Sequence, residues 1–113
     1  MKPIVGFGEY LFDYIDKNDM TDVEVYKKAQ IDRRLFSKIR SGNDYQPKKS
    51  NIFRLIIGCE MDEKHAEELL KLAGFCFSSN DKRDVIVKYF IINSIFDVDR
   101  INLVLDYFGV KNI

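Results

Sequence analysis

Residues that favour the start or the end of an α-helix recur along this chain and divide it into short segments. This pattern constrains the fold more than any other feature of the sequence. Thr21, Asp32, Asp62, Asp81 and Asp97 each precede a segment in which apolar residues recur every three or four positions. The side-chain oxygens of such residues can accept the free N–H groups of a first helical turn. Strict alternation of apolar and polar residues is not found. Only residues 85–92, which are rich in β-branched side chains, leave a strand as an alternative.

The pattern predicts seven helices. Gly42, Gly58, Gly74 and Gly109 are expected to end four of them. At Gly42 the reason is that glycine adopts the left-handed conformation of a helix end without strain. Pro47 suits the first position of a helix, and residues 43–46 before it are predicted to form a loop. The predicted helices cover residues 5–17, 21–28, 32–42, 47–58, 62–73, 81–92 and 97–108.

The composition fits one soluble globular domain. The 113 residues are 46% hydrophobic and 32% charged, which is too apolar for a disordered chain. Cys59 and Cys76 follow no paired spacing and are expected to be buried thiols in a reducing compartment. The most apolar stretch, residues 85–96, is too short to span a bilayer, and residues 1–3 do not lead into the apolar run of a signal peptide. We therefore expect a cytoplasmic protein that is not membrane-bound.

Charge is distributed unevenly although the formal net charge is zero. Residues 27–49 contain eight basic and two acidic side chains, whereas the segments on either side are net acidic. A basic segment of this kind is a candidate surface for nucleic acid. Its alternative interpretation is a solvated helix face whose cations pair with acids elsewhere in the chain.

Two short helices, over residues 21–28 and 32–42, are separated by a very short turn. This arrangement is typical of a helix-turn-helix, in which the second helix can enter the major groove of DNA. Leu35, Phe36 and Ile39 are expected to face inward. The polar side chains of the second helix would then face outward and could contact phosphates and guanine edges.

Residues 21–42 resemble the central helix pair of the Cro/C1 (XRE-type) helix-turn-helix family. The matching features include the capping Thr21, the buried Val25 and Ile31, and Ser37-Lys38-Ile39 followed by Gly42. The resemblance covers about residues 7–72. It implies an all-α fold with a five-helix repressor-type bundle over residues 5–74 and a two-helix C-terminal extension over residues 79–110, within a single helical domain of residues 1–113.

The string Ile31-Asp32-Arg33-Arg34-Leu35-Phe36-Ser37-Lys38-Ile39-Arg40 is also similar to a helical module found as a C-terminal tail of bacterial macro-domain and other proteins. That resemblance extends through the C-terminal helices and implies a fold more than a function.

Three positions depart from the repressor family. Asp22 replaces a phosphate-binding glutamine and would repel DNA, Tyr26 replaces a small alanine, and Gln30 replaces the glycine of the turn. These departures favour a second hypothesis, in which the helix-turn-helix is a scaffold for protein–protein interaction and does not bind DNA.

Catalytic and metal-binding patterns are missing from the sequence. His65 with Cys59 and Cys76 lacks the spacing of a zinc site, and His65 is interpreted as a polar residue on an exposed helix face. There is no glycine-rich phosphate loop, GxSxG or HExxH motif. We therefore expect neither an enzyme nor a cofactor, metal ion or small-molecule substrate.

The basic segment and the aromatic C-terminal helices are the two candidate interaction surfaces. The first hypothesis is a DNA-binding regulator, with a homodimer if its site is palindromic. The alternative is a protein partner or dimer surface on the aromatic C-terminal helices. These helices are expected first to fold back and enlarge the core, and both interpretations can be partly true. The candidate nucleic-acid contacts are Arg33, Arg34, Ser37, Lys38, Arg40, Lys48 and Lys49, and the candidate partner surface is Tyr89, Phe90, Phe96, Tyr107 and Phe108.

Overall fold

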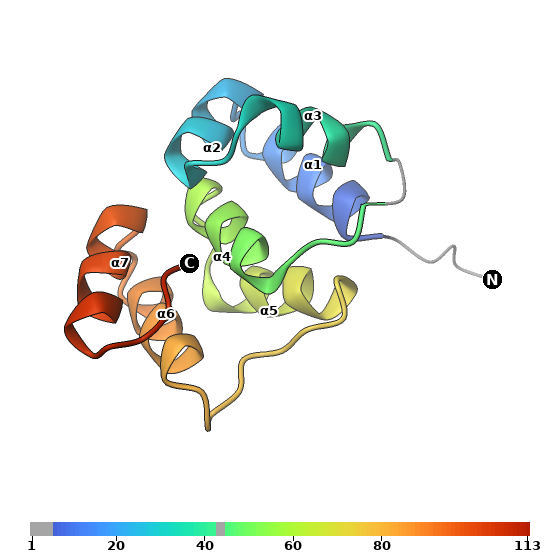
Figure 1. Cartoon of the computed structure of the whole chain (residues 1–113). Helices are drawn as coiled ribbons and strands as arrows, with labels where there is room; N and C mark the ends of the chain where they lie inside the picture. The colour runs from blue at the N-terminus through green and yellow to red at the C-terminus, as the bar shows by residue number, and fades with distance from the viewer. Residues whose placement is uncertain (1–5, 43–44) are drawn as a thin grey trace.

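The structure, a computed structural model, describes residues 6–42 and 45–113 and consists of α-helices joined by short loops (Figure 1). No strand occurs in these residues, so the all-α prediction is confirmed and the strand alternative for residues 85–92 is wrong. The predictions made for residues 1–5, 43 and 44 lie outside the described residues. The helices are α1 (Phe7–Lys17), α2 (Asp22–Ala29), α3 (Arg33–Arg40), α4 (Lys49–Gly58), α5 (Glu63–Leu72), α6 (Lys82–Ile92) and α7 (Val98–Tyr107).

The helices begin where the sequence predicts, because the predicted capping residues make the expected hydrogen bonds. Thr21 accepts the N–H of Glu24 at 3.2 Å, as the capping-box pattern requires. The four aspartates at positions 32, 62, 81 and 97 each accept an N–H group from the first turn of their helix. The start of α4 differs slightly, since the cap is Lys48 and not a residue before Pro47.

Glycine has two roles at the helix ends: it adopts the left-handed conformation, or it allows another helix to approach closely. Gly42, Gly74 and Gly109 have positive φ angles and end their helices as predicted. α4 also ends at Gly58 as predicted, but the left-handed residue that follows it is Glu60 (φ 51°). Gly58 instead lies against α2, where an added Cβ would be 2.6 Å from the carbonyl oxygen of Val25. Its missing side chain allows α2 and α4 to approach closely.

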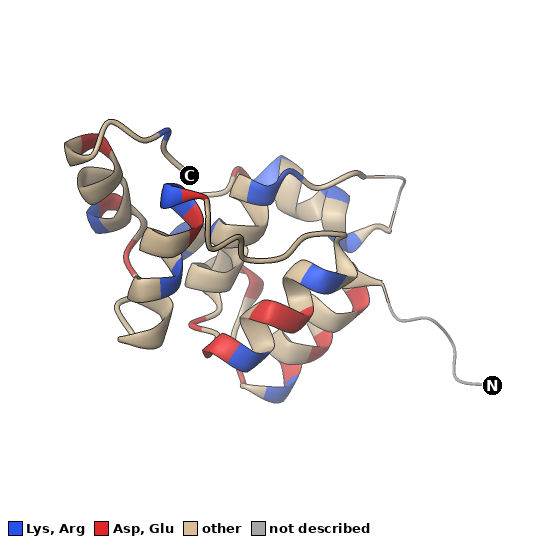
Figure 2. Cartoon of the chain, turned by 90° about the horizontal axis from the view of Figure 1, so that it is seen from below, with Lys and Arg blue, Asp and Glu red and all other residues tan. Residues whose placement is uncertain are grey.

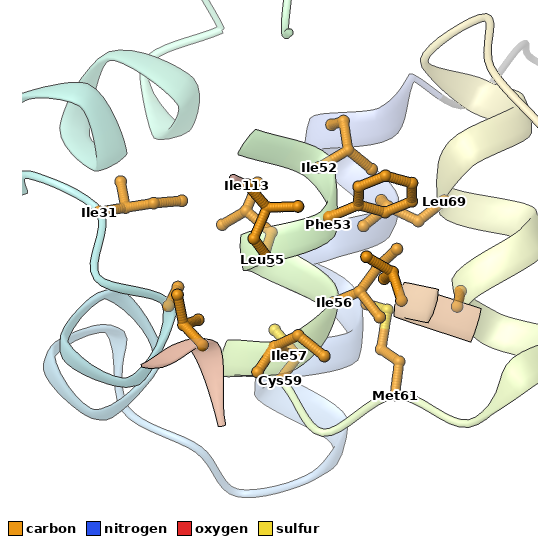
Figure 3. Packing of buried hydrophobic residues seen from close by; sticks show 14 of the residues in the cluster. Ile31, Ile52, Phe53, Leu55, Ile56, Ile57, Cys59, Met61, Leu69 and Ile113 are labelled. Carbon is orange, nitrogen blue, oxygen red and sulfur yellow. The ribbon is translucent and has the colours of Figure 1, made fainter. Parts of the chain in front are cut away.

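The core is built around α4, whose side chains are buried on nearly all sides. Figure 3 shows side chains of α4 in the middle of the cluster, between Ile31 on one side and Leu69 on the other. Five large residues of α4 are buried in this cluster, which explains why residues 52–58 are apolar apart from Arg54. They are Ile52, Phe53, Leu55, Ile56 and Ile57.

The C-terminal segment returns to the core and connects α7 with α2 and α4. Ile113 is buried, and its N–H donates to the side chain of Asn102 in α7 at 2.9 Å. Arg54 in α4 donates to the main-chain oxygens of Ile113 and Gln30 at 2.7 and 3.1 Å. Figure 1 shows this end of the chain between α7 and α4. The α6–α7 pair is therefore attached to the turn between α2 and α3.

Candidate nucleic-acid interface

The turn between α2 and α3 consists of Gln30, Ile31 and Asp32. Gln30 is left-handed, with φ 55° and ψ 43°, and Ile31 donates its N–H to the carbonyl oxygen of Tyr26 at 2.9 Å. Gln30 thus adopts the conformation that a turn glycine would have. Its side chain also donates to Asp99 of α7 at 2.9 Å, a contact that glycine cannot make.

One face of α3 is apolar and buried, and the opposite face is polar and exposed. Phe36 and Ile39 are buried as predicted, and Leu35 is half-buried. Arg33 and Ser37 are one turn apart on the helix, as are Arg34 and Lys38, so the four residues form one continuous surface. We call this the α3 face, and its members, all exposed, are Arg33, Arg34, Ser37 and Lys38.

The cations of the α3 face have no acidic partner among the described residues. None of the ion pairs found there includes Arg33, Arg34 or Lys38. The ammonium group of Lys38 lies 6.0 Å from the ring centroid of Tyr45, at the outer limit of a cation–π contact. The charges therefore point into solvent, where they are accessible to an anionic partner.

Arg40, unlike the cations of the α3 face, has an acidic partner: it forms a bidentate ion pair with Asp22. Its Nη2 and Nε donate to the two carboxylate oxygens at 2.6 and 2.8 Å, and its guanidinium lies 4.1 Å from the ring centroid of Phe12. Planar pairing of this kind fixes the geometry of both side chains. The pair neutralises Asp22, the acid expected to repel DNA, and it removes Arg40 from the unpaired cations.

Contacts between aromatic rings explain why α2 tolerates Tyr26 in place of a small residue. Tyr26 is half-buried, and its ring centroid lies 5.6 Å from that of Phe36. Phe36 in turn makes an edge contact with Phe12 at 5.4 Å. The aromatic rings thus fill the space between α1, α2 and α3.

Lys48 and Lys49 are neighbours in sequence but occupy different environments. Lys48 is exposed at the start of α4 and is available to an external anion. Lys49 instead forms an ion pair with Asp84, which is fully buried in the first turn of α6. The structure therefore gives Lys49 an internal role that its position in the basic segment did not reveal.

The predicted partner surface on α6 and α7 is only partly exposed. Tyr89, Tyr107 and Phe108 are exposed, and Phe96 is half-buried. Phe90 is buried within the core, so its inclusion in that surface is wrong. One side of the pair therefore enlarges the core, as predicted, and the other faces solvent; a partner on the solvent side stays a prediction.

Two further residues differ from the sequence interpretation. Cys59 is buried as expected, but Cys76 is exposed in the loop between α5 and α6, so that prediction is wrong. His65 is half-buried, with its Nδ1 2.7 Å from Asp62 and its ring 5.1 Å from that of Tyr14.

Over residues 6–42 and 45–113, no group of three or more histidine, cysteine or acidic side chains is arranged to hold a metal ion.

Sequence reasoning missed two structural residues. Asp84 was not singled out, although a lone acid inside an apolar helix segment is a sign of a buried, paired carboxylate. Arg54 was not singled out either, although its isolation among the apolar residues of α4 is a sign of a structural role.

Comparisons with family models, curated proteins and solved structures found no match to this chain. The resemblance to the Cro/C1 family therefore remains an expectation from the sequence.

In the part of the chain that the structure describes, no helix combines the length and apolar character needed to cross a membrane.

Proposed function

We propose that this chain is a helix-turn-helix protein that binds nucleic acid, with DNA as the expected ligand. In this proposal α1–α5 form the repressor-type core, α2 and α3 form the helix-turn-helix, and α6–α7 form a C-terminal extension. The observation that carries the proposal is the α3 face, where three cations and a hydroxyl group lie together on one exposed helix surface. Such groups contact phosphates and base edges.

The surroundings of the α3 face support the same function. Asp22, the nearest expected obstacle, is neutralised by Arg40. Lys48 lies at the start of α4, where no side chain caps the helix, and the positive end of the helix dipole and a cation together favour a phosphate. Lys49 and Arg40 form ion pairs within the chain in this proposal. The residues proposed to contact nucleic acid are therefore Arg33, Arg34, Ser37, Lys38 and Lys48.

The decisive measurement is binding to a random-sequence DNA duplex, followed by fluorescence anisotropy over a salt series. Each phosphate contact contributes roughly 0.9 to the slope of log K against log salt. The double variant Arg34→Ala with Lys38→Ala should therefore lower that slope by roughly 1.8.

A matched control separates specific contacts from net charge. Lys64→Ala with Lys71→Ala removes the same charge from exposed positions on α5 and should leave the slope nearly unchanged. If the α3 variant leaves the slope unchanged, or if both variants lower it equally, the assignment of the α3 face is wrong.

One specific observation favours a second candidate function, a protein-interaction module. Of the seven large hydrophobic side chains exposed in the described residues, all but Val23 lie on α6, α7 and the residue that follows α7. Exposed apolar residues gathered in one region are typical of interaction surfaces. Absence of DNA binding even at low salt, together with binding to a protein, would favour this function over the first.

A further inference from the structure

We propose that α6 is the contact surface through which two copies of this chain associate, in an antiparallel arrangement. The proposal does not depend on nucleic-acid binding, because α6 contains none of the residues assigned to the α3 face. It begins from the exposed apolar side chains of α6, which are Val85, Tyr89 and Ile92, with exposed fractions of 51%, 61% and 55%. We call these three residues the α6 stripe.

The α6 stripe has the spacing of a helix-packing ridge. Its members are separated by four and three residues, which places them along one side of the helix. A shallow apolar hollow lies on each side of Val85. Ile86 and Phe108 line one hollow, and Phe77 and Tyr89 line the other. A ridge between two grooves is the shape that a second helix can pack against.

The spacing of the stripe fits a second copy of α6. In an antiparallel pair with a twofold axis near Tyr89, Val85 of one copy faces Ile92 of the other, and the two Tyr89 side chains meet. An interface related by a twofold axis must be complementary to itself, and this register satisfies that condition. A parallel pair would instead bring like residues together along the whole helix, including the lysines.

Charge favours the same arrangement. The basic residues Lys82, Arg83 and Lys88 lie in the first two turns of α6, and its last turn has none. An antiparallel pair brings the exposed Lys82 of one copy to the C-terminal end of the other helix, which carries a partial negative charge. Figure 2 shows acidic and basic positions on both α6 and α7, and the formal net charge of the chain is zero, so no overall repulsion opposes association.

The association is expected to be weak, in the micromolar range, because three side chains per copy form a small interface. Light scattering after size-exclusion chromatography, from micromolar to millimolar protein and without nucleic acid, should show the mass rise from monomer to dimer. Tyr89→Glu should remain monomeric with an unchanged helical circular dichroism spectrum. Tyr107→Glu, a charge placed at a more exposed tyrosine on α7, should still form the dimer.

Disulfide formation tests the direction of the helices. In a Cys76→Ser background, Tyr89→Cys should cross-link to itself under mild oxidation, because residue 89 lies near the axis. Lys82→Cys should not, because its two copies would be about 20 Å apart, beyond the reach of a disulfide. A monomer throughout the concentration range, equal effects of the two tyrosine variants, or equal cross-linking at both positions would overturn the proposal. Since the α3 face is intact in Tyr89→Glu, its DNA salt slope reports on the proposed function separately.

Discussion

Lys49 at the start of α4 forms an ion pair with the carboxylate of Asp84 at the start of α6. Asp84 is fully buried, its Oδ2 also accepts the N–H of Ser78 at 2.8 Å, and its Oδ1 has no hydrogen-bond partner within the described residues. A buried carboxylate in this state depends strongly on its counter-charge. The pair therefore connects the core helix to the C-terminal pair across 35 residues of sequence.

Lys49→Met is expected to destabilise the protein more than Asp84→Asn. Lys49→Met should lower the free energy of unfolding by about 3 kcal/mol, because Asp84 would remain buried without a counter-charge. Asp84→Asn should lower it by only about 1 to 2 kcal/mol, because the amide can still accept the Ser78 N–H. The double variant should be more stable than Lys49→Met alone. Urea unfolding followed by circular dichroism measures all three.

Lys48→Met is the matched control, because Lys48 is the exposed neighbour. Its free energy of unfolding should change by no more than about 0.5 kcal/mol, whereas its DNA salt slope should fall. Equal destabilisation by the two lysine variants would contradict the internal role of Lys49.

Glycine-to-alanine changes in two helices are expected to have opposite signs. Gly8→Ala in α1 should stabilise the protein by about 0.5 to 1 kcal/mol, because its added Cβ comes no closer than 3.7 Å to Ile39. Gly58→Ala should destabilise it by about 1 to 3 kcal/mol, because the Cβ would overlap the carbonyl oxygen of Val25 and the Cβ of Ala29. Thermal and urea unfolding give both values. A stabilising Gly58→Ala would show that α2 and α4 are not in close contact.

The two cysteines are expected to differ greatly in reactivity. Burial raises the pKa of the Cys59 thiol to about 12, so its reactive thiolate form is scarce at neutral pH. Cys76 is exposed. In the native protein a thiol reagent at pH 8 should label one cysteine quickly, and Cys76→Ser should abolish that fast phase. Both should react in denaturant, and fast labelling of Cys59 without denaturant would argue against its buried position.

The cap of α5 should contribute stability that depends on pH. A hydrogen bond from the backbone N–H of His65, together with one from its side chain, lowers the pKa of Asp62. A carboxyl group whose pKa is lower in the folded state stabilises the fold above its unfolded pKa, and this contribution is lost as the pH falls through the folded pKa. Asp62→Ala should thus be less stable than the parent by about 1 kcal/mol at pH 7. The difference should disappear in strong acid, and a difference independent of pH would be inconsistent with a cap by the ionised carboxylate.

The pair between Asp22 and Arg40 gives a prediction of increased binding. Asp22→Asn removes a negative charge beside the α3 face and releases Arg40 for contact with phosphate. Under the proposed function, the variant should bind DNA more tightly at low salt and with a steeper salt slope. Glu68→Gln on α5 is the control of equal charge change. Equal gains for both variants would attribute the effect to net charge alone.

Local signals in the sequence were sufficient to predict most of the secondary structure. Thr21 and the four capping aspartates predicted helix starts correctly because a cap acts on N–H groups within three residues of itself. The inward face of α3 was also predictable, since Phe36 and Ile39 follow the helical period. The end of α4 at Gly58 was predicted too, but the close contact of Gly58 with α2 was not, because glycine serves both helix ends and close helix contacts and the sequence does not distinguish them.

By itself the sequence determined the all-α class, the helix starts and the polar face of α3, because hydrogen bonding and helical periodicity act over a few residues. Only the tertiary structure decided which cations are available. Arg40 and Lys49 belong to the same basic segment as Arg34 and Lys38, but they meet Asp22 and Asp84, which lie 18 and 35 residues away. It also decided that Phe90 is buried while Tyr89 is exposed. Ion pairing and burial depend on distances in space, which the packing of α4 against its neighbours sets.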